Sequence, residues 1–347
     1  MPVRPRPRPR AAAVGAAATA LVLALLPSAA GAAAEPAVGA SPAAPPAVAG
    51  PAARPPVVFG VAAATRAQVE AHERVLGESV EGVRMYRTWG RGGVIGPQQR
   101  WARDAGHSVF LSIRSERADG SPVRFADVAA ARPGSALHAD LVAMAREVKA
   151  YGAPIGITYH HEPEAAASTR LGDGPEFAAA WRRVVSVFRA EGVTNARFIW
   201  TTTLYGFERT DARAAARYYP GDDVVDAIAG DGYNWYDCRG GSTWKSFADV
   251  VEPLRRFGAA HPHEDLVLME VSSVEDPRRP GRKGDFWRGA PALLASPGYG
   301  QLSAVLYYGG ENHDPGHGCR WDYRTSSSSL AGWVAMARSD VFGGELR

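Results

Sequence analysis

Cysteine is scarce in this sequence, since Cys238 and Cys319 are the two cysteines among 347 residues. Neither has a second cysteine nearby, so the spacing argues against a cysteine-based zinc site. A glycine-rich phosphate-binding turn is also missing after the first expected strand. There, residues 59–62 (Phe-Gly-Val-Ala) lead directly into Ala63-Ala64-Thr65. This absence argues against a dinucleotide-binding fold.

An excess of charge of either sign is absent from the body of the chain. The 39 basic and 36 acidic residues give a net charge of +3, but residues 1–34 hold four arginines and no acid. The remainder therefore carries 35 basic and 36 acidic residues, a net charge of −1. We expect no nucleic-acid partner and no attraction of the folded domain to an anionic membrane.

The N-terminal segment has the three-part order of a secretory signal peptide. Four arginines precede an apolar stretch, and a tract of small residues follows. We expect a signal peptide over residues 1–34, and therefore a secreted protein. Gly15 and Pro27 interrupt the apolar stretch, which disfavours a permanent membrane span. Residues 35–56 are rich in alanine and proline, which predicts a linker.

Secretion changes what is expected of the two cysteines. In an oxidising compartment a disulfide between Cys238 and Cys319 is the default, and two free thiols are the alternative. Closing a loop of that length would stabilise the fold by about 4–5 kcal/mol in the chain-entropy model.

Short apolar runs alternate with amphipathic segments from residue 57 to the C-terminus. Strands are expected at 57–63, 82–88, 108–112, 155–160, 196–201, 226–233, 266–271 and 302–308. Helices are expected at 66–76, 136–151, 175–191, 243–260 and 284–295, among others. Such alternation predicts a parallel sheet, and eight repeats predict an α/β fold closed as a (β/α)8 TIM barrel over residues 57–347.

Two of the expected strands end in a glutamate. The fourth leads into Glu162 and the seventh into Glu270, at the end of the barrel where active sites of this fold lie. A carboxylate after four apolar residues is costly unless it has partners, so Glu270 needs a reason to be there. The structural alternative to a catalytic role is an ion pair at the barrel rim with Arg84, Arg87 or Arg114.

Two facing carboxyl groups suit the cleavage of a glycosidic bond. One protonates the leaving oxygen, while the other supports the positive charge that develops at the anomeric carbon. In retaining enzymes the two groups lie about 5–5.5 Å apart and the second becomes a covalent nucleophile. The fourth and seventh strands lie nearly opposite in an eight-stranded barrel, so their terminal side chains can face each other across its mouth.

These motifs resemble glycoside hydrolase family 26, within the large clan of retaining (β/α)8 hydrolases. His161 precedes Glu162, where most of the clan has asparagine; Asp231-Gly232-Tyr233 matches the family's Asp-x-Tyr, and Met269-Glu270 matches its seventh strand. The resemblance covers roughly residue 57 to the C-terminus. It implies Glu162 as acid/base, Glu270 as nucleophile, and His161, Asp231 and Tyr233 in the substrate site, with Tyr233 hydrogen-bonded to the nucleophile.

The sequence departs from the family after the fourth strand. Family members more often show Arg-Pro-x-His-Glu, whereas residues 158–162 here read Thr-Tyr-His-His-Glu. Ala165-Ala166-Ala167 replaces the aromatic-rich stretch of mannan-cleaving members. The substrate implied is therefore a β-linked polysaccharide of the β-mannan or β-glucan type. We expect a monomer that needs no cofactor and no metal.

Aromatic side chains near strand ends offer flat faces on which sugars stack. The candidates are Trp89, Trp200, Trp235, Tyr307 and Tyr308. We expect Trp235 and Tyr308 to bind substrate, whereas core packing is an equal alternative for any one of the five. Glu164 is expected either to bind sugar hydroxyls or to be a solvated loop acid. His313 and His317 are expected in a loop near the mouth of the site.

Two other functions fit parts of the pattern. A metal site would draw on His160, His161, Glu162, Asp231 and His313. Against it, adjacent histidines on a continuing strand point to opposite faces. The second alternative is a secreted glycan-binding barrel without activity. Retention of both glutamates argues against it.

Overall fold

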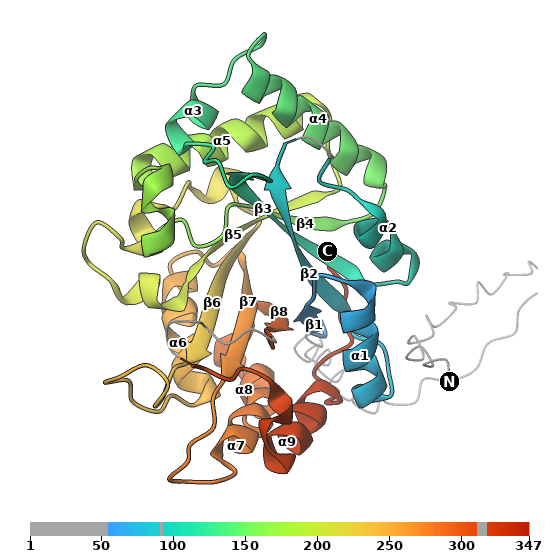
Figure 1. The fold of residues 1–347 in the computed structure, drawn as a ribbon, viewed down its shortest axis with the longest axis vertical. Helices are drawn as coiled ribbons and strands as arrows, with labels where there is room; N and C mark the ends of the chain where they lie inside the picture. Colours follow the sequence, from blue (N-terminus) through green and yellow to red (C-terminus); the bar gives the residue numbers. More distant parts are fainter. Residues whose placement is uncertain (1–54, 91–92, 311–317, 347) are drawn as a thin grey trace, which may run out of the picture. The chain divides into compact units, whose positions relative to one another are not determined.

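The computed structural model describes residues 55–90, 93–310 and 318–346. Eight parallel strands follow one another in chain order and β8 pairs with β1, which confirms the predicted (β/α)8 TIM barrel (Figure 1). The strands are β1 (Val58–Ala62), β2 (Gly82–Trp89), β3 (Ser108–Arg117), β4 (Ile155–Tyr159), β5 (Ala196–Thr203), β6 (Ala227–Asn234), β7 (Asp265–Ser273) and β8 (Leu302–Tyr307). The predicted signal peptide and most of the linker lie outside the described residues.

Helices follow the strands along the chain. They are α1 (Arg66–Leu76), α2 (Pro97–Asp104), α3 (Phe125–Ala129), α4 (Ala136–Tyr151), α5 (Gly174–Ala190), α6 (Phe247–Gly258), α7 (Arg282–Arg288), α8 (Ala290–Ala295) and α9 (Ser327–Ala337). Among the described residues, no helix has the length and apolar character needed to cross a membrane.

Two predicted helices differ from the structure for local reasons. The helix expected from residue 243 begins at Phe247, because Ser246 caps it and accepts a hydrogen bond from the Asp249 amide. The helix expected over 284–295 is split at Gly289. Pro291 has no N–H with which to continue the preceding helix.

The lower part of the barrel is filled by apolar side chains. The interior cluster consists of Val58, Phe110, Ile199, Ala227, Ala229, Val267, Met269, Ala304 and Leu306. Glycine on neighbouring inward positions makes room for them. A Cβ atom on Gly60 would lie 2.2 Å from Leu306 Cδ2, and one on Gly156 would lie 2.6 Å from Ile199 Cδ1. The barrel is therefore packed solid below the site.

Above this layer the inward positions become polar. Two residues further along five of the strands stand Arg84, Ser112, Thr158, Thr201 and Asp231, all buried. Because side chains alternate along a strand, these five share the inner face with the apolar layer below them. A polar layer in a barrel core must be paired internally, and its members are hydrogen-bonded to one another or to backbone.

Strand β7 contains one extra residue at its midpoint. Gly230 of β6 pairs with Leu268 and Asp231 pairs with Glu270, so Met269 is left without a partner on β6. Met269 packs in the barrel interior. Strict alternation would then turn Glu270 outward, toward the helices. The bulge re-aims Glu270 into the barrel mouth.

Candidate active site

Both carboxylate oxygens of Glu270 are held by donors from β2 and β6. The Tyr86 hydroxyl donates to Oε1 at 2.5 Å, and Arg84 Nη1 lies 2.9 Å from the same atom. The Tyr233 hydroxyl donates to Oε2. The side chain is 9% exposed, so one edge remains open to a ligand. A guanidinium and two hydroxyl donors fix the orientation of this carboxylate.

Arg84 is completely buried and links two carboxylates. Its guanidinium donates to Asp231 Oδ1 at 2.7 Å and to Oδ2 at 3.3 Å, while also contacting Glu270. Burial disfavours the charge, but Asp231, Tyr86 and Glu270 outweigh that effect and raise the pKa of Arg84. Asp231, predicted to bind substrate, thus lies beneath the site as the partner of Arg84.

One of the three arginines considered as ion-pair partners of Glu270 forms that pair. Arg84 makes the contact, whereas Arg87 donates to the Gly93 carbonyl and Arg114 pairs with Glu116. A pair with Arg84 does not exclude catalysis, because the guanidinium also stabilises the charge that a nucleophilic carboxylate needs.

Glu162 is held just beyond the end of β4 by an unusual backbone. The strand ends at Tyr159, one residue earlier than predicted, and both His160 and Glu162 have positive φ angles of 48° and 51°. The His160 amide donates to Ile113 O on β3 at 2.8 Å, and the Glu162 amide donates to Thr201 O on β5 at 3.0 Å. Bonds to both flanking strands thus hold a conformation that is costly for non-glycine residues.

The pKa of Glu162 is raised well above that of an ordinary glutamate. Burial is the main cause, followed by the negative charges of Asp231, Glu270 and Glu164. The two glutamates are linked through Tyr86, which donates to Glu270 and whose ring lies 5.4 Å from that of His161, the residue before Glu162. Their surroundings differ. Glu270 receives donors, whereas the charged neighbours of Glu162 are mostly acids, with Arg84 acting in the opposite direction.

His161 and His160 have different surroundings. The His161 ring lies 5.4 Å from that of Tyr86, and its buried Nδ1 has no hydrogen-bond partner within the described residues. Burial and then Arg84 lower its pKa, so the imidazole is neutral. His160 instead bonds through both ring nitrogens, to the Ser115 amide and the Ser168 hydroxyl.

These histidines bear on the metal alternative. His160 has no free nitrogen for a ligand bond, and burial lowers its pKa to about 3. In the part of the chain that the structure describes, no group of three or more metal-ligating side chains is assembled. His313 and His317 lie outside the described residues.

An aromatic wall stands beside Glu270. The Tyr233 ring lies 5.9 Å from Tyr308 and 5.5 Å from Trp235, and Trp321 lies 4.9 Å from Trp235. The Arg239 guanidinium lies 3.6 Å from the centre of the Trp235 ring. Trp235 and Tyr308 are partly exposed, as substrate platforms must be. The other candidates, Trp89, Trp200 and Tyr307, are buried in the core.

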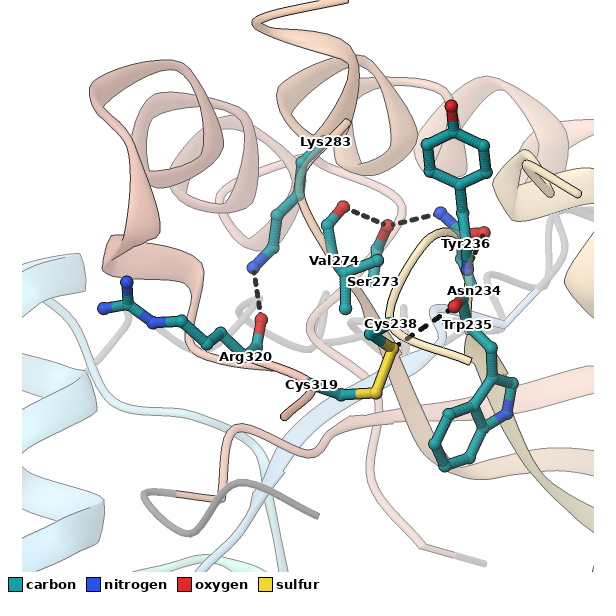
Figure 2. Close-up of a disulfide and its surroundings, with 9 residues drawn as sticks. All are labelled: Asn234, Trp235, Tyr236, Cys238, Ser273, Val274, Lys283, Cys319 and Arg320. Atoms are coloured by element: carbon teal, nitrogen blue, oxygen red, sulfur yellow. Dashed lines mark hydrogen bonds between the residues drawn. A yellow bond between two sulfur atoms is a disulfide. The ribbon is translucent and has the colours of Figure 1, made fainter. Parts of the chain in front are cut away.

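The predicted disulfide between Cys238 and Cys319 is present and braces this wall (Figure 2). It joins the loop after β6 to the segment that follows β8, and both cysteines pack with Trp321. The buried ammonium of Lys283 donates to the backbone carbonyls of Arg320 and Asp322 at 3.2 and 2.6 Å. Two independent attachments therefore fix the segment that carries Trp321.

Glu164 has neither of the two roles expected for it. It is 1% exposed, and its Oε1 accepts from the Thr203 amide at 2.7 Å and from the Thr203 hydroxyl at 2.6 Å. The Glu164 carbonyl accepts from Arg213 at 2.6 Å. This acid is therefore a structural brace between the loops after β4 and β5.

Sequence reasoning did not identify Tyr86 or Trp321. For Tyr86 a signal was available, because Gly82, Arg84 and Tyr86 alternate with the apolar Val83 and Met85. On a barrel strand, that alternation places the polar residues inside. Trp321 carries no comparable signal in the sequence, because its position in the aromatic wall is set by contacts with residues distant along the chain.

Comparison with solved structures places this architecture among family 26 glycoside hydrolase folds. The family 26 domain of an endo-β-mannanase/endo-β-glucanase from Prevotella bryantii superposes with a TM-score of 0.54 at 13% identity, covering 83% of this chain and 90% of that one. An endo-β-1,4-mannanase domain from Bacillus sp. JAMB-750 gives 0.57 at 13% identity, covering 83% and 87%. The chain therefore has a family 26-like fold.

Sequence comparison adds one curated relative. Endoglucanase H from Acetivibrio thermocellus is 31% identical over 141 residues, which span 38% of this chain and 15% of that protein. No family model matches the chain.

Proposed function

We propose that this chain is a secreted, retaining glycoside hydrolase that cleaves β-linked polysaccharide of the β-mannan or β-glucan type. Glu162 is the acid/base and Glu270 is the nucleophile. The observation that carries the proposal is the pair of carboxyl groups at one barrel mouth with opposite surroundings. Glu270 is held by contacts from Arg84 and two tyrosine hydroxyls, whereas burial and neighbouring acids raise the pKa of Glu162 and favour its protonated form.

In the first step, Glu162 gives its proton to the glycosidic oxygen as the bond to the anomeric carbon breaks. A Glu270 oxygen attacks that carbon, and a glycosyl ester forms. The hydroxyls of Tyr86 and Tyr233 orient the nucleophile. Neutral His161, which is partly exposed and packs against Tyr86, is suited to contact the sugar.

The second step needs Glu162 as a base. Once Glu270 is esterified its negative charge is gone, and with it one of the causes that raise the pKa of Glu162. The pKa of Glu162 therefore falls as the intermediate forms. Ionised Glu162 then takes a proton from water, the water oxygen attacks the anomeric carbon, and Glu270 leaves as a carboxylate.

The relatives support the substrate class. Structures of the same fold come from enzymes described as β-mannanases, and the curated relative is an endoglucanase. The disulfide and the N-terminal sequence pattern support secretion. An Asp-x-Tyr motif joined to Glu270 through the Tyr233 hydroxyl supports assigning the nucleophile to Glu270.

Incubating the purified domain with β-mannan, mixed-linkage β-glucan and xylan tests the proposal. We expect reducing ends to be released from at least one of the first two. Binding of a glycan without any cleavage would instead favour the alternative of a non-catalytic glycan-binding barrel.

A further inference from the structure

A polar hollow lies between the segment that follows β5 and the side of α6, where its lining runs from Asp249 to Arg256. Its volume is about 430 Å³. The side chains that line it are Glu208, Thr243, Trp244, Lys245, Asp249, Glu252, Pro253 and Arg256. Glu208 ends the short helix η2 (Leu204–Glu208) directly after β5, and Trp244 belongs to the loop after β6. None of these residues has a part in the proposed reaction.

The Trp244 loop is attached to the strand that carries Tyr233. Asn234, the last residue of β6, is completely buried. Its Oδ1 accepts from the Lys245 amide at 3.0 Å, and its Nδ2 donates to Ser273 Oγ of β7 at 3.0 Å. The loop that carries Trp244 is therefore anchored where β6 ends, and the hollow extends from there along α6.

The loop after β6 presents aromatic rings in two directions. The side chains of Trp235 and Tyr236 point away from each other (Figure 2). Trp235 contacts Tyr233 and Trp321 of the aromatic wall. The Tyr236 ring lies 5.6 Å from that of Trp244. One rigid loop thus connects the wall of the candidate active site with the outer hollow.

The lining of the hollow has the chemistry of a sugar site. The Arg282 guanidinium lies 4.5 Å from the centre of the Trp244 ring, and Arg282 lines a second hollow, of about 420 Å³, that shares Trp244. The indole therefore borders both hollows. An aromatic ring matches the apolar face of a pyranose.

Charged side chains that line the hollow form only weak ion pairs with one another. Lys245 and Arg256 lie 3.6 and 3.9 Å from Glu208, at partly exposed positions where such pairs are weak. Their donors and acceptors are available to hydroxyl groups.

We propose that this hollow is an outer subsite that binds a stretch of the β-linked polysaccharide away from the bond being cut. The inference rests on the proposed function and deepens it. A polymer engaged at the two glutamates continues beyond the barrel mouth, whereas a short aryl glycoside does not extend that far. Occupancy of the hollow therefore affects the binding of polymer and leaves the chemical step on a small substrate unchanged.

Affinity electrophoresis through gels containing β-mannan, mixed-linkage β-glucan or xylan tests the proposal. Binding is measured in the full chain carrying Glu270→Gln, so that the gel is not digested. We expect Trp244→Ala to weaken binding to the retarding glycan about three- to tenfold, the size of one stacking contact. In the otherwise unchanged enzyme, KM for that polymer should rise similarly, with kcat/KM on an aryl glycoside unchanged.

Trp101→Ala is the matched control. Trp101 is also partly buried against the core with an arginine over its ring, Arg66 at 5.4 Å, and it lines neither hollow. The Trp101→Ala variant should bind the glycan as tightly as the parent does. Glu208→Ala, at a partly exposed position, provides a second variant if Trp244→Ala does not fold, and it should also weaken binding.

Three results would overturn the subsite. In the first, Trp244→Ala and Glu208→Ala both bind glycan as tightly as the parent. In the second, Trp101→Ala weakens glycan binding as much as they do, and in the third the parent binds none of the three glycans. A parent that binds but cuts nothing would instead refute the proposed activity and leave the binding site standing.

Discussion

The second half of β7 and the turn just past β4 place the same residue type in different surroundings. Glu270 follows a bulge in a regular strand and receives three donors on its two oxygens. Glu162 stands just past a strand, in a left-handed conformation, and its charged neighbours are three acids and Arg84, of which the acids have the larger effect on its pKa. Two residues of the same type can therefore be suited to the two different roles proposed for them, because their environments differ.

Removing the nucleophile should give the largest effect. Glu270→Ala deletes the group that forms the covalent bond, so we expect turnover to fall by several orders of magnitude on every substrate. Steady-state kinetics measures this loss, and circular dichroism should show an intact fold. Activity near that of the parent would refute the assignment.

Glu162→Ala should produce a loss that depends on the leaving group. Poor leaving groups need the proton, so polysaccharide hydrolysis should fall steeply, whereas aryl glycosides with good leaving groups should be partly rescued. Kinetics on a series of aryl glycosides checks this. Equal losses across the series would argue against the acid/base role.

The same variant should change the pH profile. The raised pKa of Glu162 keeps the acid form available above the usual glutamate range, so kcat/KM of the parent should fall as pH rises through that raised pKa. In Glu162→Ala, this alkaline limb should be absent with an activated substrate. Its persistence would assign the limb to another group.

Loss of one hydroxyl donor to Glu270 should have a smaller effect. Tyr86→Phe and Tyr233→Phe each remove one hydrogen bond and leave Arg84 in place, so we expect kcat/KM to fall about ten- to hundredfold. Tyr205→Phe, which removes a hydroxyl from an exposed ring in the segment after β5, is the control. If kcat/KM falls no further in Tyr86→Phe and Tyr233→Phe than in the control variant, the two hydroxyl donors do not contribute to the action of Glu270.

The smallest effect concerns stability. A raised pKa means that the stability contributed by protonated Glu162 is present below the unfolded pKa and is lost as pH rises through the folded value. Glu162→Gln stays neutral, so we expect it to unfold at higher urea than the parent near pH 8, by roughly 0.5–2 kcal/mol. Near pH 4 the difference should vanish. A constant difference would show that proton binding is not its cause.

Much of the fold and of the candidate site could be predicted from the sequence. Strand–helix alternation predicted the barrel, and the position of Glu162 followed from where β4 ends. Glu270 was expected at the end of the seventh strand, but β7 continues to Ser273. The disulfide was expected because a secreted protein folds in an oxidising compartment. Each of these depends on local pattern or chemistry.

Features set by register and tertiary contact could not be predicted in this way. The bulge at Met269 depends on how β7 pairs with β6, and strict alternation would have turned Glu270 outward. Glu164 looked like a loop acid, yet it is buried against Thr203 of β5. The left-handed backbone of His160 and Glu162 is held by carbonyls of β3 and β5, strands remote in sequence.

Trapping the covalent intermediate tests the central claim most directly. An activated 2-deoxy-2-fluoroglycoside of the sugar released in the glycan screen slows both steps but lets the ester accumulate. The account predicts that mass spectrometry of the digested protein finds one added sugar, on the peptide that contains Glu270. A label on any other residue, or hydrolysis of the parent substrate with no trapped adduct, would contradict it.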